Sequence, residues 1–328
     1  MKALQFSSFG SPTDVVELAE IEPADPGRGQ LAVAIEAAPI NPSDLTLIKG
    51  VYGVRPELPA AAGAEGVGRV IAVGDGVGAA RIGERVLVVP TLEQATWREQ
   101  TVLDERNAVP VDADGDALQL AMLGINPITA YCLLHGYVKL APGAWVAQTG
   151  ASSAIAGYIV ALAKHAGLRT LNVVRRADSV TPLLDAGADV VLVEAADLTE
   201  QAADATAGAP LELILDAVAG EPVAQLASLL KAGGPIVSYT ARNRQPLSIS
   251  IVDLIFKELS VHGYWLNRWL DITPQETIVR TYRELADLVR NGILAAPVEA
   301  TYALADYREA IGHAARNDRH GKVLFTVQ

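Results

Sequence analysis

Small and hydroxyl side chains fill the loop of the stretch AQTGASSAIAGYIVALAKHAG, residues 147–167, whose apolar ends predict a strand followed by a helix. Gly150, Ser153 and Ala156 keep small side chains three residues apart, and the hydroxyls of Ser152 and Ser153 can cap the helix or donate to a ligand. The N–H groups and dipole at the start of a helix favour phosphate. The loop therefore suits a phosphate cradle, although close strand–helix packing without a ligand would need the same small residues.

An arginine pair ends the next apolar segment, TLNVVRR. Arg175 and Arg176 stand at the distance from the loop where a carboxylate would bind the ribose 2′-hydroxyl of NAD. Guanidinium groups suit a 2′-phosphate instead, through charge-assisted hydrogen bonds that are often bidentate. The pair favours NADPH over NADH, and the alternative is a solvated pair on a surface loop.

Strands and helices alternate from Trp145 onward, and this rhythm predicts a doubly wound parallel sheet of the α/β class. A helix is expected over residues 153–166. The first 118 residues read as a β-rich unit punctuated by glycines, which a helix after Leu270 and the terminal strand GKVLFTV could complete. The predicted parallel strands are WVAQT, RTLNVV, DVVLV, LELILDAV, GPIVSYT and LSVHGYW.

Composition narrows the class of protein. The 328 residues suggest two domains, and 50% hydrophobic residues indicate a globular chain. A net charge of −12 disfavours nucleic acid and anionic membranes as partners. The longest uncharged apolar run, residues 154–163, is about half of a membrane-spanning helix. With one cysteine, Cys132, expected to be buried and inert, and no targeting pattern at the N-terminus, we expect a cytoplasmic protein.

Several motifs resemble the zinc-free branch of the medium-chain dehydrogenase/reductase superfamily, which holds quinone oxidoreductases and enoyl thioester reductases. The likeness covers essentially the whole chain. It implies a GroES-like catalytic domain at residues 1–120 and 270–328, a Rossmann NADPH-binding domain at 121–269, and a homodimer. The motifs are INPSDLTLIKGVYG, AGAEGVGRVIAVGDGV, GINPITAY, the loop described above, LILDAVAG and IFKELSVHGYWLNRWL.

The resemblance also implies that this chain binds no zinc. Zinc-dependent relatives hold the catalytic metal with a Cys and a His, where this sequence has Asn41 and Ala64. The sequence has no four-Cys lobe, and its five histidines show no paired spacing.

Within the branch, NPSD, GVYG, NVVRR and especially FKELSVHGYWLNRW resemble the NADPH-dependent 2-enoyl thioester reductases of fatty acid synthesis. The resemblance implies Tyr52 as proton donor and an acyl-thioester substrate, with acyl carrier protein as a possible partner. It gives the substrate or nicotinamide pocket as Asn41, Asn126, Thr129 and Trp265. It gives the cofactor contacts as Asn126, Gly150, Ser152, Ser153, Ala154, Ile155, Arg175, Arg176, Tyr239, Thr240, Ala241, Arg242, Tyr264, Trp265, Leu266 and Lys322.

The chemistry that these residues would serve is reduction of a conjugated C=C bond. Hydride adds to the β-carbon, a proton adds to the α-carbon, and charge collects on the carbonyl oxygen. A tyrosine, with an ordinary pKa near 10, stays protonated at neutral pH and can donate, while Thr129 or the Asn41 amide could hold the oxygen. Three alternatives stay open: a quinone or enone reductase, a non-catalytic NADPH sensor, and a Tyr52 that only packs.

Overall fold

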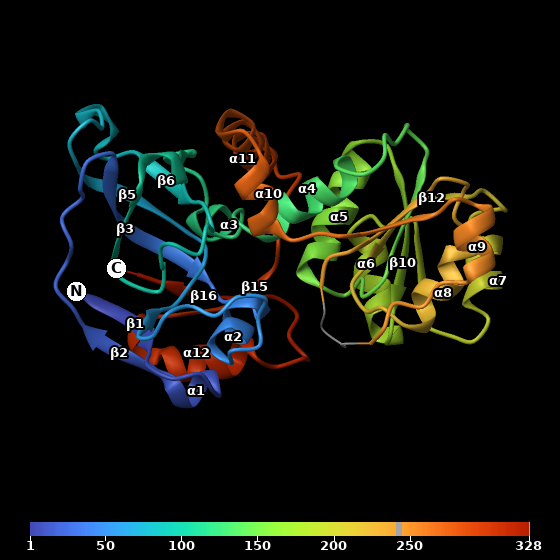
Figure 1. Ribbon diagram of the computed structural model, residues 1–328, viewed down its shortest axis with the longest axis horizontal. Helices are drawn as coiled ribbons and strands as arrows, with labels where there is room; N and C mark the ends of the chain where they lie inside the picture. Colours follow the sequence, from blue (N-terminus) through green and yellow to red (C-terminus); the bar gives the residue numbers. More distant parts are fainter. Residues whose placement is uncertain (241–244, 328) are drawn as a thin grey trace. The chain divides into compact units, whose positions relative to one another are not determined.

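The structure is a computed structural model that describes residues 1–240 and 245–327 (Figure 1). Its internal contacts divide the chain into two compact units. Unit 1 comprises Met1–Ile128 and Leu270–Gln328, and unit 2 comprises Thr129–Trp269. The domain limits suggested by the sequence, at residues 120 and 269, stay a prediction.

Unit 2 is built on the parallel sheet that the alternating pattern predicts. Its strands take the order β11-β10-β9-β12-β13-β14, and each neighbouring pair is parallel. The order runs outward from β9 to β11 and then restarts on the other side of β9, as in dinucleotide-binding folds. The doubly wound fold class is therefore confirmed. The strands are β9 (Trp145–Gln148), β10 (Arg169–Val174), β11 (Val190–Val193), β12 (Leu211–Asp216), β13 (Pro235–Ser238) and β14 (Ser260–Gly263).

Helices cover both faces of this sheet because its strands carry apolar side chains on both sides. In β10, Leu171 joins a buried cluster with α7 and α8, whereas Val174 joins another with α5 and α6. Successive strand residues point to opposite faces, so an odd separation of three residues puts these two clusters on opposite sides. The helices of unit 2 are α5 (Ala154–His165), α6 (Val180–Asp185), α7 (Leu198–Ala205), α8 (Glu221–Ala227) and α9 (Ile251–Phe256).

Unit 1 is β-rich, as its glycine-punctuated sequence predicts. Its larger sheet takes the order β15-β16-β3-β5-β6-β8, with β7 also paired to β3, and a smaller sheet takes the order β2-β1-β4. The strands are β1 (Lys2–Phe6), β2 (Val16–Glu20), β3 (Gln30–Pro39), β4 (Ala60–Ala61), β5 (Gly66–Val73), β6 (Arg85–Val88), β7 (Gln100–Asp104), β8 (Ala108–Pro110), β15 (Val298–Tyr302) and β16 (Lys322–Thr326).

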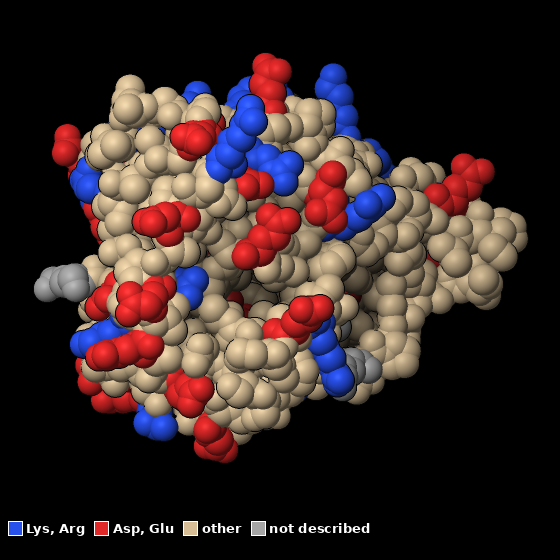
Figure 2. Space-filling view, turned by 60° about the vertical axis from the view of Figure 1, so that its left-hand side comes forward, with Lys and Arg blue, Asp and Glu red and all other residues tan. Residues whose placement is uncertain are grey.

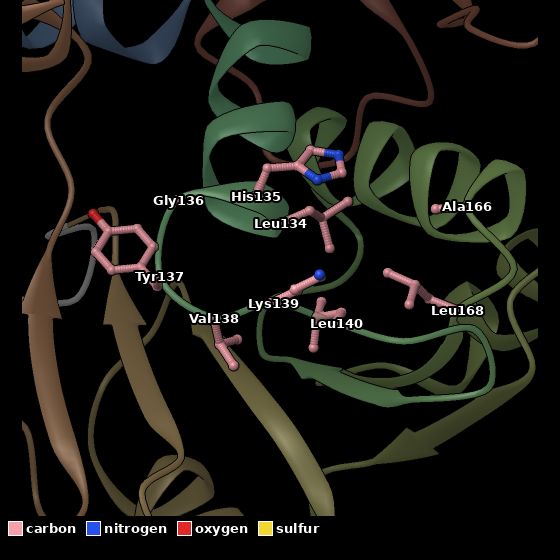
Figure 3. Close-up of a pocket in the computed structure, with 9 residues that line it drawn as sticks. All are labelled: Leu134, His135, Gly136, Tyr137, Val138, Lys139, Leu140, Ala166 and Leu168. Carbon is pink, nitrogen blue, oxygen red and sulfur yellow. The ribbon is translucent and has the colours of Figure 1, made fainter.

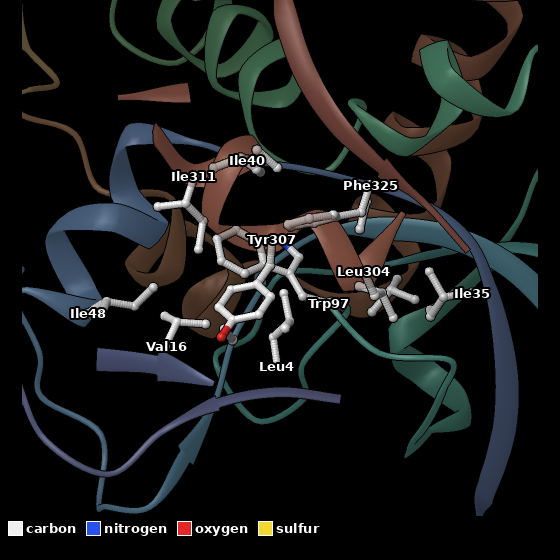
Figure 4. Close-up of a cluster of buried hydrophobic side chains, with 14 of the residues drawn as sticks. Leu4, Val16, Ile35, Ile40, Ile48, Trp97, Leu304, Tyr307, Ile311 and Phe325 are labelled. Atoms are coloured by element: carbon white, nitrogen blue, oxygen red, sulfur yellow. The ribbon is translucent and has the colours of Figure 1, made fainter. Parts of the chain in front are cut away.

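The core of unit 1 surrounds Trp97 (Figure 4). The Trp97 indole N–H donates to the Pro39 carbonyl at 3.1 Å, and its ring packs edge-on against Phe325 with centroids 5.3 Å apart. Tyr307 and Ile311 of α12 pack on the same cluster. The unit 1 helices are α1 (Pro12–Val15), α2 (Pro42–Ile48), α3 (Ala117–Ala121), α11 (Gln275–Arg290) and α12 (Tyr307–Ala314), while α4 (Asn126–His135) and α10 (Leu266–Ile272) cross the unit limits.

Charged side chains of both signs are interspersed on the face of the molecule that Figure 2 shows. Asp and Glu number 38 against 26 Lys and Arg in the whole chain. Within the described residues, no helix combines the length and apolar character needed to cross a bilayer.

Candidate active site

Helix α2 lies between two side chains that the sequence assigns to catalysis and the substrate pocket. Asn41 precedes the helix as its N-cap residue, and Tyr52 follows in the turn beyond it. Asp44 fixes the start, because its carboxylate accepts the Asn41 backbone N–H at 2.8 Å. Gly50 turns the chain after α2 with φ of +71°, and a Cβ there would lie 2.9 Å from Phe9. The helix and this turn therefore set the spacing between the Asn41 amide and the Tyr52 phenol.

The Asn41 amide group is held on both sides by buried charged side chains. Its Nδ2 donates to Glu65 Oε1 at 2.7 Å, and its Oδ1 accepts a hydrogen bond from Lys322 Nζ. Strand β16 pairs antiparallel with β3, and extending their register puts Lys322 beside Asn41. Each of the three residues is at most 5% exposed. Strand pairing thus joins residues 281 positions apart in one buried contact.

Burial dominates the ionisation of this network. Desolvation raises the pKa of Glu65 to about 8 and the pKa of Asp44 to about 6, although the Lys322 ammonium acts to lower both. Desolvation also lowers the pKa of Lys322, against the two carboxylates, which act to raise it. The folded state therefore favours fewer charges here than the unfolded chain carries.

The free energy of unfolding should fall as pH rises from about 5 to about 8. In the unfolded chain Glu65 ionises near its ordinary pKa of 4.5, but in the folded protein it keeps its proton up to about pH 8. Unfolding in this window releases that proton, which costs stability at up to about 1.4 kcal/mol per pH unit. The glutamine of Glu65→Gln cannot ionise. Urea denaturation between about pH 5 and pH 8 should therefore show that the free energy of unfolding falls less steeply with pH for the variant than for wild type. Equal slopes of the free energy of unfolding against pH for wild type and Glu65→Gln would contradict the raised pKa of Glu65. Asp44 and Lys322 are present in both proteins and contribute to both slopes, so they cannot account for a difference.

In unit 2, the loops after three neighbouring strands meet at the buried carboxylate of Asp216. It accepts the Thr149 hydroxyl at 2.9 Å and the Ser238 hydroxyl at 2.7 Å. The backbone N–H groups of Val218 and Ala219 donate to it at 3.0 and 2.8 Å. These bonds fix the carboxyl ends of β9, β12 and β13, where the strand order reverses and open α/β sheets bind ligands.

The loop between β9 and α5 passes close to the loop after β12. Gly150 has φ of +61°, and a Cβ there would lie only 3.1 Å from Ala217. Ser153 caps α5, its hydroxyl accepting the Ala156 N–H at 3.3 Å, and Ser152 is exposed. Because the first N–H groups of a helix have no intrahelical partner, this end of α5 suits an anion. The Ala154 and Ile155 N–H groups belong to that first turn.

The arginine pair follows the carboxyl end of β10, the strand beside β9. The Ala151 N–H donates to the Val173 carbonyl at 3.1 Å, which joins the cradle loop to this strand. Both arginines are exposed. Arg176 pairs with Asp178 at 3.1 Å, whereas Arg175 has no ion-pair partner among the described residues. Arg175 is therefore the guanidinium better placed to take an anionic ligand without breaking an existing pair.

Other predicted nucleotide contacts lie at the same edge of the sheet. Tyr239 follows β13, and burial raises the pKa of its hydroxyl. The others are Thr240 after β13, Tyr264 and the exposed Trp265 after β14, and Leu266 at the start of α10, while Ala241 and Arg242 lie outside the described residues.

The predicted site residues fall into two groups, one in each unit. Asn41, Tyr52, Asn126 and Lys322 belong to unit 1, where Asn126 is buried at the start of α4. Thr129, also buried, and the other predicted contacts belong to unit 2. The structure joins Asn41 to Lys322 directly, and the role of Lys322 as a cofactor contact stays a prediction.

A cavity of about 370 Å³ in unit 2 lies away from these residues (Figure 3). Its lining residues precede β9 and β10, so it sits at the amino ends of the strands. Ligands of open α/β sheets bind at the carboxyl ends. The cavity is therefore separate from the candidate nucleotide site. The lining residues are Leu134, His135, Gly136, Tyr137, Val138, Lys139, Leu140, Ala166 and Leu168.

Sequence patterns did not single out Glu65 or Asp44, although both belong to the unit 1 network. Both stand inside motifs, NPSD and AGAEGVG. A usable signal was present at Glu65, because a carboxylate within a run of small and apolar residues is expected to be buried and must then find partners.

Two family descriptions match the chain. Residues 27–124 match the alcohol dehydrogenase GroES-like domain, and residues 154–289 match the zinc-binding dehydrogenase family. The residues present do not fit zinc. Asn41 offers a neutral amide that is already bonded to an ammonium and a carboxyl group, and Cys132 is buried in unit 2 with a pKa raised by desolvation to about 11. Among the described residues, no group of three His, Cys, Asp or Glu side chains could hold a metal ion.

Whole-chain relatives share one superfamily. A mitochondrial enoyl-(acyl-carrier-protein) reductase of Bos taurus is 36% identical over 333 residues, covering 100% of this chain and 89% of its own. The structure of a putative NADPH:quinone reductase from Bacillus thuringiensis has a TM-score of 0.90 and 29% identity, covering 100% of this chain and 99% of its own.

A variant of Etr1p in complex with NADP and crotonyl-CoA has a TM-score of 0.82 and 25% identity, covering 99% of this chain and 98% of its own. The matches therefore agree over both units of the fold. The chain belongs to the medium-chain dehydrogenase/reductase superfamily and is an NAD(P)-dependent oxidoreductase of the enoyl reductase or quinone reductase type.

Proposed function

We propose that this protein uses NADPH to reduce the C=C bond of trans-2-enoyl thioesters. The observation that carries the proposal is the segment from Asn41 to Tyr52, in which α2 holds a buried amide at one end and a phenol just beyond the other. An amide donor and a proton donor are the two groups that this reduction needs besides a hydride source. The full-length likeness to an enoyl-(acyl-carrier-protein) reductase supports the same substrate class.

NADPH would bind at the carboxyl edge of the unit 2 sheet. The Gly150–Ile155 loop and the start of α5 would hold the pyrophosphate, and Arg175 would pair with the 2′-phosphate. Gly150 has a positive φ, and a Cβ there would lie 3.1 Å from Ala217. The absence of a side chain at Gly150 therefore suits a loop that other backbone, or a ligand, approaches closely.

The bound cofactor supplies hydride to the β-carbon of the enoyl group. The C=C electron pair then moves toward the carbonyl, whose oxygen gains charge as an enolate, and Asn41 or Thr129 would donate a hydrogen bond to it. The Tyr52 hydroxyl would transfer its proton to the α-carbon, which completes the saturated thioester. Water would return a proton to the Tyr52 phenolate.

Crotonyl-CoA is the substrate that tests this function. Purified protein with NADPH and crotonyl-CoA should consume the reduced cofactor, measured by its absorbance. Turnover of quinones without turnover of thioesters would favour a quinone reductase, the activity named for the Bacillus thuringiensis relative. NADPH binding with turnover of neither substrate class would favour a sensor. Comparing crotonyl-CoA with a crotonyl acyl carrier protein would identify the acyl carrier.

We also propose a homodimer that forms through unit 2. Strand β14 is the last in its sheet order, and exposed apolar side chains lie on it and on α9. Phe256 of α9 is 80% exposed, and Val261 of β14 is 44% exposed. An unpaired edge with apolar neighbours tends to pair with another chain. Light scattering should give twice the 34.5 kDa mass of one chain, and the mass of one chain would contradict the dimer.

A further inference from the structure

Thr149 and Asp216 form a buried hydrogen-bonded pair beside the proposed nucleotide loop. Both residues are completely buried, Thr149 directly after β9 and Asp216 at the end of β12. The Thr149 hydroxyl donates to Asp216 Oδ1 at 2.9 Å, and it accepts the Ala217 backbone N–H at 2.9 Å. One hydroxyl group therefore joins the loop before α5 to the loop after β12.

The same carboxylate oxygen holds the backbone of the loop after β12. Oδ1 of Asp216 also accepts the N–H groups of Val218 and Ala219, at 3.0 and 2.8 Å. Ala219 has φ of +58°, a left-handed conformation that a residue with a side chain keeps only where its surroundings hold it. The bonds to Asp216 thus stabilise a strained turn next to the loop before α5.

This turn and the loop before α5 are packed closely together. A Cβ on Gly150 would lie 3.1 Å from the Ala217 side chain and 3.2 Å from the Val218 side chain. A shift of the turn would therefore change the space available to Gly150. Ser152 and Ala154, on the same loop as Gly150, are exposed, so a nucleotide could reach the loop without contacting the buried pair.

We propose that Thr149 and Asp216 are positioning residues, which hold the loop before α5 in the conformation that the pyrophosphate of the coenzyme requires. This inference rests on the proposed function, in which the pyrophosphate binds to the Gly150–Ile155 loop. Backbone N–H groups bind phosphate best when they are already oriented, because a loop that must become ordered on binding loses affinity. Neither Thr149 nor Asp216 touches the coenzyme in this scheme.

Thr149→Val tests the proposal by replacing the hydroxyl with a methyl group of similar size. Asp216 then loses one donor and the Ala217 N–H loses its acceptor, so this side chain no longer joins the two loops. We expect the dissociation constant of NADPH to rise about 10-fold. The constant of NADH should rise by the same factor to within about twofold, because both coenzymes contain the pyrophosphate. Loss of a 2′-phosphate contact would instead weaken NADPH alone.

Thr170→Val is the matched control for this substitution. Thr170 is also buried in unit 2, where its hydroxyl accepts the Asn172 Nδ2–H at 3.1 Å and the Asp189 N–H at 3.4 Å. It lies near the amino end of β10, at the opposite edge of the sheet from the proposed nucleotide site. Both dissociation constants should therefore stay within about twofold of wild type.

Two variants of Asp216 separate its hydrogen bonds from its charge. Asp216→Asn keeps an oxygen that can accept from Thr149 and the two backbone N–H groups, and its amide nitrogen can donate to the Ser238 hydroxyl. Affinity for both coenzymes should then stay within about threefold of wild type. Asp216→Ala removes these bonds and should weaken both coenzymes at least as much as Thr149→Val. The double variant should lose less than the product of the two single losses, as expected for residues that share a contact.

Thermal unfolding of each variant is recorded first. If Thr149→Val is unfolded at the assay temperature, Thr149→Ala replaces it, because Ala removes the same hydroxyl without placing a methyl group against Asp216. Wild-type affinity for both coenzymes in the variant used, an equal loss in Thr170→Val or in Asp216→Asn, or a loss confined to NADPH would overturn the inference alone. A wild-type protein that binds neither coenzyme would overturn the proposed function, and the inference with it.

Discussion

Tyr52→Phe is expected to lower the turnover of crotonyl-CoA by about 10²- to 10⁴-fold, the usual contribution of a positioned proton donor. The substitution removes one hydroxyl from a half-buried side chain in the turn after α2, so the helix and the Asn41 network should be retained. Affinity for NADPH should not change, because the proposed nucleotide contacts around α5 belong to unit 2. Steady-state kinetics and a titration with NADPH measure the two quantities.

Tyr302→Phe is the matched control for that experiment. It also removes a phenol hydroxyl from unit 1, where Tyr302 bonds His313 Nδ1 at 3.0 Å on strand β15. This control should keep wild-type turnover. If Tyr52→Phe also kept it, Tyr52 would be only a packing residue, and the proton donor would have to be sought elsewhere.

Arg175→Ala is expected to weaken NADPH binding by about 10- to 100-fold, which corresponds to the loss of one or two charge-assisted hydrogen bonds. Binding of NADH, which lacks the 2′-phosphate, should change by less than about threefold. Arg176 would replace part of the lost contact with the 2′-phosphate only if it broke its ion pair with Asp178. The measurement is the ratio of the two dissociation constants for wild type and variant.

Arg169→Ala provides the comparison at the opposite end of the same strand. Arg169 starts β10, is half exposed and stacks on the Trp145 ring at 4.0 Å. Removing it changes the charge of the protein equally but leaves the carboxyl edge of the sheet intact. An equal loss of NADPH affinity in both variants would assign the effect to net charge and contradict the 2′-phosphate contact.

The architecture of unit 2 could be predicted because its signal is local. Strands buried on both faces appear as short apolar runs, and the helices between them carry their own start signals. The helix expected at residues 153–166 is found as α5, Ala154–His165, with Ser153 as its cap. The parallel sheet followed from the alternation alone, since parallel neighbours need a crossover of this length.

The network in unit 1 could not be predicted in the same way. The contact of Lys322 with Asn41 depends on which strand pairs with β16, and no short-range pattern specifies a partner 281 residues away. The resemblance singled out both residues, but for separate roles, and it gave no reason for them to touch. Glu65 was overlooked because its neighbours in sequence are small and apolar, and its partners come from distant segments.

The pairing of β16 with β3 also has a consequence for biosynthesis. A ribosome makes Asn41 281 residues before Lys322, so the amide lacks its cationic neighbour until that further length of chain has been synthesised. The nucleotide-binding sheet, by contrast, is complete once Gly263 has emerged. A nascent chain stalled between these two points could acquire the ability to bind coenzyme before its reaction centre is finished.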